Sequence, residues 1–163
     1  MLDDTIYPVT IGTDGQVVEI EIVNEYGRGN IHLTKVDSEY PDNKLTGAVF
    51  EVYKDSNNNS KLDEGDELLG TLTEKEIGEY GMNDLFYGRY FVKETKAPDG
   101  FVLDTDVYEV VIDTDGKTYD VENKAGVGFI NEVMRGNLKI VKTSSDGKVK
   151  GFAFRITGAN GYE

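Results

Sequence analysis

Short runs in which apolar and polar residues alternate recur along the whole chain of 163 residues. The runs are separated by Gly, Asn or Asp-Gly, and no long stretch keeps the 3.6-residue period of an amphipathic helix. Asp-Gly pairs at 14–15, 115–116 and 146–147 each lie between two apolar runs, which predicts a tight hairpin turn at each place. One short helical turn is expected at 73–77. The pattern therefore predicts an all-β fold, either a sandwich or a barrel.

Three of the predicted strands place a polar residue in phase with their apolar face. Lys35 continues the alternation of NIHLTK, Glu94 that of YFVKE, and Asn131 that of VGFIN. Burying any one of them alone would cost on the order of several kcal/mol, so we expect the three side chains to meet inside the fold. His32, the one histidine, falls on the face opposite Lys35 and is expected at the surface or between sheets rather than on a metal.

A buried meeting of these three groups would permit covalent chemistry. Loss of hydration lowers the pKa of a lysine and raises the pKa of a glutamic acid, so a neutral amine beside a protonated acid becomes accessible at neutral pH. The amine of Lys35 could then attack the carboxamide of Asn131 while Glu94 supplies and returns a proton, which yields an amide bond and ammonia. An ordinary Lys-Glu ion pair with a nearby Asn is the alternative that periodicity leaves open.

The chain also repeats itself. Residues 24–35 align without a gap on residues 131–142, an offset of 107 positions (131 minus 24). Residues 2–15, LDDTIYPVTIGTDG, likewise align on residues 103–116, LDTDVYEVVIDTDG. The second offset is 101 positions (103 minus 2), close to the first, and self-similarity at a nearly constant spacing is typical of tandem modules that share one fold.

The simplest division of the chain follows from that spacing. Residues 1–28 are interpreted as the C-terminal strands of a preceding module, 29–135 as one complete module, and 136–163 as the N-terminal strands of a following module. Asn24 and Lys142 are the flanking equivalents of the reactive pair, and each lacks its own partners within this chain. Neither is expected to be cross-linked here, although an exposed half-module could exchange strands with a second copy.

The charge and composition of the chain exclude several classes of binding partner and of covalent chemistry. The 31 acidic and 17 basic residues give a formal net charge of -14, which argues against nucleic acid and anionic membranes as partners. No apolar run is long enough to span a bilayer, and residues 1–28 lack the pattern of a signal peptide, so export and anchoring signals are expected outside this segment. The absence of cysteine excludes disulfides and thioesters here.

Three stretches together resemble a known family. The run from Tyr90 to Phe101, YFVKETKAPDGF, resembles the "E-box" of the Cna B-type, prealbumin-like domains found in pilins and adhesins of Gram-positive bacteria. Lys35 in NIHLTKVD and Asn131 in GFINE match the same family in the same order. The resemblance covers all of residues 29–135.

The resemblance implies a fold and a role. It implies an immunoglobulin-like, prealbumin-like β-sandwich in tandem modules, with an autocatalytic bond between Lys35 and Asn131 that Glu94 assists. It also implies an extracellular stalk or spacer, attached to the cell wall, whose partners are neighbouring modules of the same polypeptide. No cofactor is required, and the chain is not expected to be an enzyme, because the trio would consume its own Lys and Asn in one turnover. The alternative is an adhesive domain that binds a host matrix protein or a glycan.

A second candidate site is a loop with the spacing of a calcium-binding loop. Oxygen-bearing side chains stand at loop positions 1, 3, 5, 9 and 12, which are Asp55, Asn57, Asn59, Asp63 and Asp66. At position 7, Lys61 is expected to contribute its backbone carbonyl. Ser60 at position 6 and Asp66 at position 12 replace the usual Gly and Glu. The alternative is a solvated turn that joins two strands.

Overall fold

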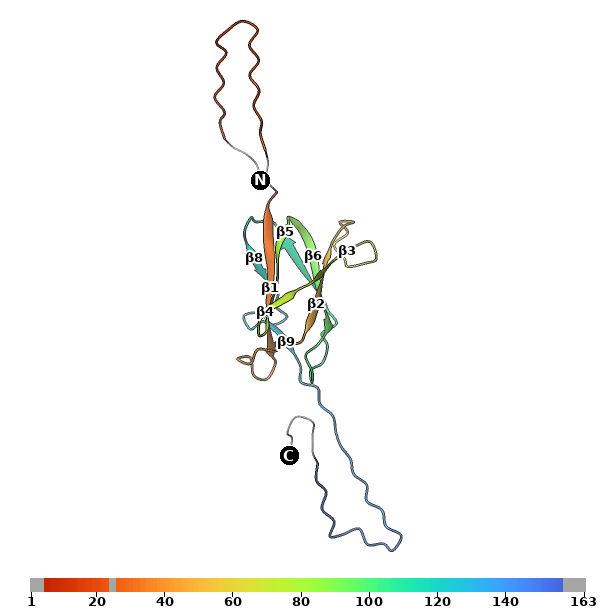
Figure 1. Ribbon diagram of the computed structural model, residues 1–163. Helices are drawn as coiled ribbons and strands as arrows, with labels where there is room; N and C mark the ends of the chain where they lie inside the picture. The colour runs from red at the N-terminus through yellow and green to blue at the C-terminus, as the bar shows by residue number, and fades with distance from the viewer. Residues whose placement is uncertain (1–4, 24–25, 157–163) are drawn as a thin grey trace.

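The computed structural model describes residues 5–23 and 26–156. Its nine strands all lie between Arg28 and Asn131 (Figure 1). The strands are β1 (Arg28–Asp37), β2 (Val49–Lys54), β3 (Glu67–Thr71), β4 (Thr73–Glu76), β5 (Glu79–Phe86), β6 (Gly88–Lys96), β7 (Val107–Ile112), β8 (Thr118–Asp120) and β9 (Phe129–Asn131).

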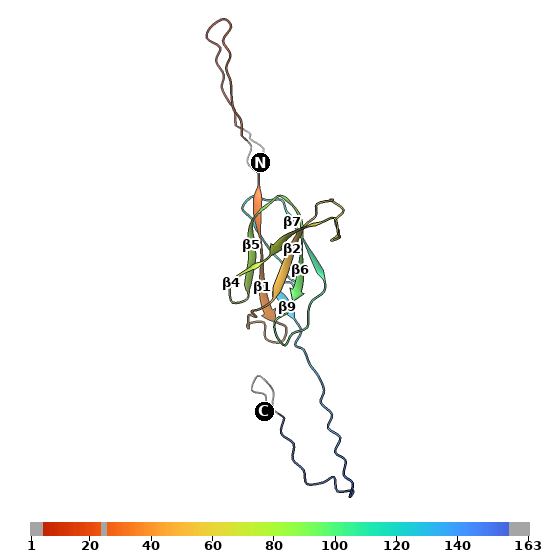
Figure 2. The same ribbon diagram turned by 45° about the vertical axis from the view of Figure 1, so that its right-hand side comes forward.

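The strands form two sheets. One has the order β4-β5-β1-β8, with β9 also paired to β1, and the other has the order β3-β2-β6-β7. β1 is antiparallel to β5 but parallel to both β8 and β9. The two sheets pack against each other with one shared core, which confirms the predicted all-β sandwich (Figures 1 and 2). No helix among the described residues has the length and hydrophobicity needed to cross a membrane.

Aromatic rings fill the core beside the first strand. Phe50 of β2 meets the ring of Phe129 edge-to-face at 4.9 Å and that of Tyr80 at 5.4 Å. Tyr108 of β7 approaches Phe129 in the same manner at 5.1 Å. The ammonium of Lys35 lies 5.6 Å from the Phe129 ring centroid. The end of β1 therefore places a charged group against an apolar, ring-lined wall, which is the setting in which desolvation acts most strongly.

Two predictions of local structure need correction. A helical turn is expected at 73–77, but residues 73–76 form strand β4, which pairs antiparallel with β5. A segment this short is too short for a stable helix of its own, and pairing with β5 satisfies its backbone instead. The turn at Asp115-Gly116 forms, with φ of 70° at Gly116, but it does not join a hairpin. β7 pairs with β6 and β8 pairs with β1, so this turn crosses from one sheet to the other.

The segments 5–23 and 137–156 lie outside the sandwich, at its opposite ends (Figures 1 and 2). Each reverses direction at a predicted Asp-Gly turn, where Gly15 and Gly147 have φ of 76° and 74°. No strand is assigned in these two described segments. Their apolar side chains are exposed, as Ile6 at 89% shows. The two arms thus carry an alternating pattern that the sandwich does not bury.

Candidate functional site

The three polar side chains predicted to face inward do so. Lys35 of β1 is 0% exposed, Glu94 of β6 is 1% exposed and Asn131 of β9 is 2% exposed. β9 lies parallel to β1 with Phe129 opposite Lys35, and β6 belongs to the facing sheet. The trio therefore bridges the sandwich where the first and last strands run side by side.

Hydrogen bonds join two members of the trio directly. The side-chain Nδ2 of Asn131 donates to Oε2 of Glu94 at 2.9 Å, and the backbone N–H of Asp104 donates to the same oxygen at 2.9 Å. Nζ of Lys35 donates to the backbone oxygen of Phe129 at 3.1 Å. The second oxygen of Glu94 and the carbonyl oxygen of Asn131 are buried without a partner among the described residues, so each keeps a free acceptor position.

Burial shifts the pKa of Lys35 and the pKa of Glu94 in the directions that favour their neutral forms. Desolvation lowers the pKa of Lys35 to about 8, even though the negative charges of Glu94 and Asp104 act to raise it. Desolvation likewise raises the pKa of Glu94, against the lowering effect of its hydrogen bonds from Asp104 and Asn131. Burial therefore favours the neutral amine of Lys35 and the protonated acid of Glu94 more than water does.

A second carboxylate, which the sequence reasoning missed, stands behind Glu94. Asp104 lies in the loop between β6 and β7, and its Oδ2 accepts from the hydroxyl of Tyr108 at 2.7 Å and from Nδ2 of Asn123 at 2.8 Å. Burial works against its charge, yet these hydrogen bonds lower the pKa of Asp104. The internal repeat could have indicated this pair. When LDDTIY (2–7) is aligned on LDTDVY (103–108), an Asp and a Tyr occur in both at the positions of Asp104 and Tyr108.

Asn131 is among the residues that line a small cavity. It has a volume of about 220 Å³ and is lined by residues 102–104, residues 130–132 and Asn123. The loop that carries Asp104 forms one wall and the end of β9 forms the other.

Of the two flanking equivalents, only Lys142 lies in the described part of the chain. Lys142 lies in the exposed arm at 137–156, where its ammonium sits 4.3 Å from the ring centroid of Phe152. Asn24 lies outside the described residues. The structure thus joins the trio of the complete module and gives no second trio within the part of the chain that it describes.

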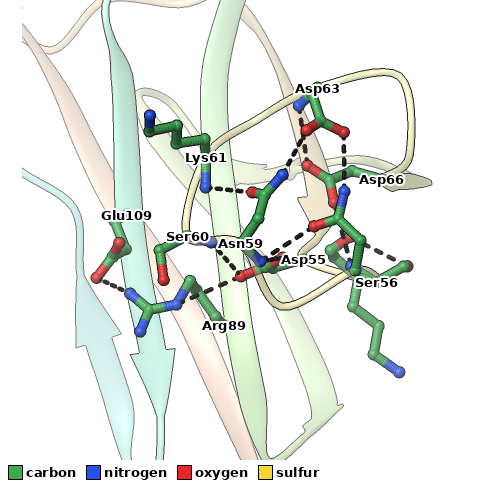
Figure 3. A network of polar contacts seen from close by, with 11 residues as sticks. Asp55, Ser56, Asn59, Ser60, Lys61, Asp63, Asp66, Arg89 and Glu109 are labelled. Carbon is green, nitrogen blue, oxygen red and sulfur yellow. Dashed lines mark hydrogen bonds and ion pairs between the residues drawn. The ribbon is translucent and has the colours of Figure 1, made fainter.

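The 55–66 loop connects β2 to β3, and its polar side chains make contacts with one another and with the loop's own backbone (Figure 3). Ser60 adopts φ of 62°, the left-handed conformation for which position 6 normally requires glycine. The side-chain oxygen of Asn57 accepts from the N–H of Asn59, and that of Asn59 accepts from the N–H of Lys61. Ser60 thus adopts the backbone conformation that position 6 requires, although it is not glycine.

The acidic side chains of the loop are occupied by protein groups. The Asp55 carboxylate is buried, accepts from the N–H groups of Asn59 and Ser60, and pairs with Nε of Arg89 at 3.4 Å (Figure 3). Asp66 accepts from the N–H of Asp63 and closes the loop. In the described part of the chain, no three His, Cys, Asp or Glu side chains converge into a metal-binding group. Calcium would have to draw these carboxylates together.

His32 occupies the surface position predicted for it. Its Nδ1 lies 2.7 Å from Oδ1 of Asp120 and its Nε2 lies 2.8 Å from Oε2 of Glu79. These contacts tie β1 to β8 on one side and to β5 on the other. The side chain braces the outer face of the sheet, opposite the buried trio.

Comparison with known proteins identifies a family for most of this chain. The family of the SpaA prealbumin-like fold domain matches residues 29–125. The trypsin-resistant surface T6 protein of Streptococcus pyogenes serotype M6 is 35% identical over 80 residues, which are 49% of this chain and 13% of that protein.

Solved structures resemble the chain as well. The TIE protein of Bacillus anthracis has a TM-score of 0.50 at 25% identity, over 66% of this chain and 18% of its own. BcpA, the major pilin subunit of Bacillus cereus, has a TM-score of 0.48 at 30% identity, over 66% of this chain and 31% of its own. The chain thus spans only a minor part of the length of these relatives. The prealbumin-like resemblance is confirmed, and the chain belongs to the family of SpaA prealbumin-like fold domains.

Proposed function

We propose that residues 29–135 form a stalk or spacer module of a Gram-positive surface protein, either an adhesin or a pilin, braced by an amide bond between Lys35 and Asn131. The observation that carries the proposal is the meeting of three almost completely buried polar side chains, from three strands, with Glu94 hydrogen-bonded to Asn131. The surface location named for the T6 relative supports an extracellular, wall-attached setting.

The proposed reaction forms one C–N bond and breaks another. The neutral Nζ of Lys35 attacks Cγ of Asn131, while the protonated Glu94 donates to the carboxamide oxygen and so stabilises the tetrahedral adduct. Glu94 then takes a proton from Nζ and passes one to Nδ2 of Asn131, the atom that lies 2.9 Å from its Oε2. Ammonia leaves, the carbonyl re-forms, and Glu94 ends with its starting proton. The reaction needs no cofactor, and it runs once per molecule because it consumes Lys35 and Asn131.

The arms fit a modular arrangement. In the organisation proposed from the repeat, residues 1–28 and 136–163 are parts of the preceding and following modules. Two features support this: the strands of the sandwich all lie between residues 28 and 131, and the described arms expose alternating apolar side chains at opposite ends of it. Such side chains become buried when the remaining strands of each neighbouring module are present.

Intact-mass measurement tests the cross-link. The wild-type chain should weigh one ammonia less than its sequence, because one amide bond replaces one carboxamide and one amine. Lys35→Ala and Asn131→Ala should each restore the full mass. Lys96→Ala, which removes an exposed lysine of β6, should keep the deficit. A wild-type chain of full mass, or one that has lost two ammonias, would contradict the proposed single bond.

Calcium binding at residues 55–66 is a separate proposal, supported by the left-handed backbone at Ser60 and the oxygen spacing of the loop. Titration calorimetry on chelator-treated protein should show heat with calcium that Asp55→Ala removes, since Asp55 holds the first loop position. Asp99→Ala, in an exposed turn elsewhere, should bind like wild type. Absence of heat with the wild-type chain would end the proposal.

A further inference from the structure

A side chain outside the reactive trio holds the segment on which Asn131 lies. Asn123 stands in the loop between β8 and β9. Its Oδ1 accepts from the backbone N–H of Ile130 at 2.7 Å, and its Nδ2 donates to the backbone oxygen of Ile130 at 2.9 Å. The carboxamide therefore pairs with both backbone groups of the residue before Asn131, as a neighbouring strand would.

The same side chain connects this segment to the acid. Nδ2 of Asn123 also donates to the Asp104 carboxylate at 2.8 Å, and the backbone N–H of Asp104 donates to Glu94 at 2.9 Å. Asn131 donates to that Glu94 oxygen. A closed circuit of contacts thus runs from Glu94 through Asp104, Asn123 and Ile130 to Asn131, and back to Glu94.

We propose that Asn123 is a positioning residue for amide formation, which fixes the Asn131 carboxamide against Glu94 and Lys35. This inference rests on the cross-linking reaction proposed above. β9 has three residues, and its partner strand is β1, so its backbone has few ladder hydrogen bonds to hold it in place. A displacement of about 1 Å in a reacting group can cost roughly 100-fold in rate. Asn123 prevents that displacement without touching the reacting atoms.

Replacing Asn123 by Ala should slow the reaction while the fold is kept. In a time course of cell-free synthesis followed by mass spectrometry, Asn123→Ala should release ammonia roughly 10- to 100-fold more slowly than wild type. Asn30→Ala is the matched control, because Asn30 makes a similar bridge at the opposite end of the module, to Asp84 and Thr118. The control should react at the wild-type rate. A wild-type rate for Asn123→Ala would overturn the inference.

A second readout does not depend on the reaction. In a Lys35→Ala background, which cannot form the bond, the side-chain amide protons of Asn131 should exchange with solvent faster when Asn123→Ala is added, and Asn30→Ala should leave them unchanged. Unchanged exchange on adding Asn123→Ala would overturn the inference even if the wild-type chain loses ammonia. A wild-type chain that keeps its ammonia would refute the cross-link, and this exchange measurement would still report on positioning.

The Asp variant separates positioning from simple loss of packing. A carboxylate at position 123 can accept from the N–H of Ile130 but cannot donate, whereas its protonated form can do both. Asn123→Asp should therefore form the amide bond more slowly than wild type, and the ratio between the two rates should approach one as the pH falls. If the ratio of the two rates does not change with pH, the result would contradict a positioning role that depends on hydrogen bonds.

Discussion

Replacing Glu94 by Gln is expected to give a folded protein that forms the amide bond roughly 10²- to 10⁴-fold more slowly, the range that general acid-base catalysis supplies. Gln keeps the size of Glu and still offers an oxygen to the N–H of Asp104, but it has no proton to transfer. Loss of the Glu94 charge also lowers the pKa of Lys35 further, so the neutral amine becomes more abundant. A slower reaction despite a better nucleophile would identify proton transfer as the missing step.

Time-resolved mass spectrometry of newly made chains measures this rate, and circular dichroism checks that the sandwich has formed. Glu94→Ala should likewise keep a recognisable β-sheet spectrum and its ammonia. Glu132→Gln is a suitable control, because Glu132 is an exposed carboxylate next to Asn131 and should not affect the rate. If Glu94→Gln cross-links as fast as wild type, Glu94 is a structural partner and not the acid.

The pH profile of the wild-type rate gives an independent view of the same step. The reaction needs one proton shared between Lys35 and Glu94. Above pH of about 8, the pKa of Lys35, that proton is lost and no acid remains. Below the pKa of Glu94, which burial raises above its ordinary value, Lys35 stays charged and cannot attack. We therefore expect a bell-shaped profile. The Gln variant should lose the fall above pH of about 8, because it has no acid left to deprotonate, and should keep a fall at low pH, because Lys35 is still charged there.

The alternation of residues was sufficient to predict the buried trio. In a strand, successive side chains point to opposite faces, so Lys35, Glu94 and Asn131 had to follow their apolar neighbours into the core once the strands formed. The same period and the Asp-Gly turns predicted an all-β fold, either a sandwich or a barrel, and the resemblance to Cna B-type domains implied the sandwich. That the three strands bring their polar groups to one place could be argued only from the cost of leaving each one alone.

The supporting residues could not be predicted in the same way. Asp104 and Asn123 lie between strands, where no period relates sequence position to direction, and their meeting depends on the path of two separate loops. For a similar reason, the sequence did not predict that β7 and β8 belong to different sheets. An Asp-Gly turn specifies a reversal of direction, but not whether the next strand pairs in the same sheet or crosses to the other one.

The arrangement of β1 and β9 determines how the module would carry force. β1 begins at one end of the sandwich with Arg28, β9 lies parallel to its far part, and the chain leaves from the opposite end after Asn131 (Figures 1 and 2). Tension between neighbouring modules therefore pulls these two strands in opposite directions along their axes. An amide bond from Lys35 to Asn131 would carry that tension from β1 directly into the outgoing chain, so residues 36–130 would bear none of it.

Lys35→Met is expected to turn an inextensible module into an extensible one. Pulled from both ends in a single-molecule experiment, the wild-type module should show no unfolding step from the segment between Lys35 and Asn131, whereas the variant should lengthen by roughly 300 Å, at about 3.5 Å for each released residue. Heat should reveal the same bond. Closing a loop of nearly 100 residues contributes about 4 to 5 kcal/mol in the chain-entropy account, which corresponds to a fall in Tm of roughly 20 °C in the variant.

Asn131→Ala provides the decisive comparison, because it removes the same bond through a different side chain. The two variants differ in volume and in what they leave beside Glu94, so effects that came from packing alone would differ between them. If the bond carries the load, both should show the same added length, and Lys96→Met, at an exposed position of β6, should remain as inextensible as wild type. A Lys35→Met module that fails to lengthen would show that hydrogen bonds between β1 and β9, and not a covalent link, resist the pull.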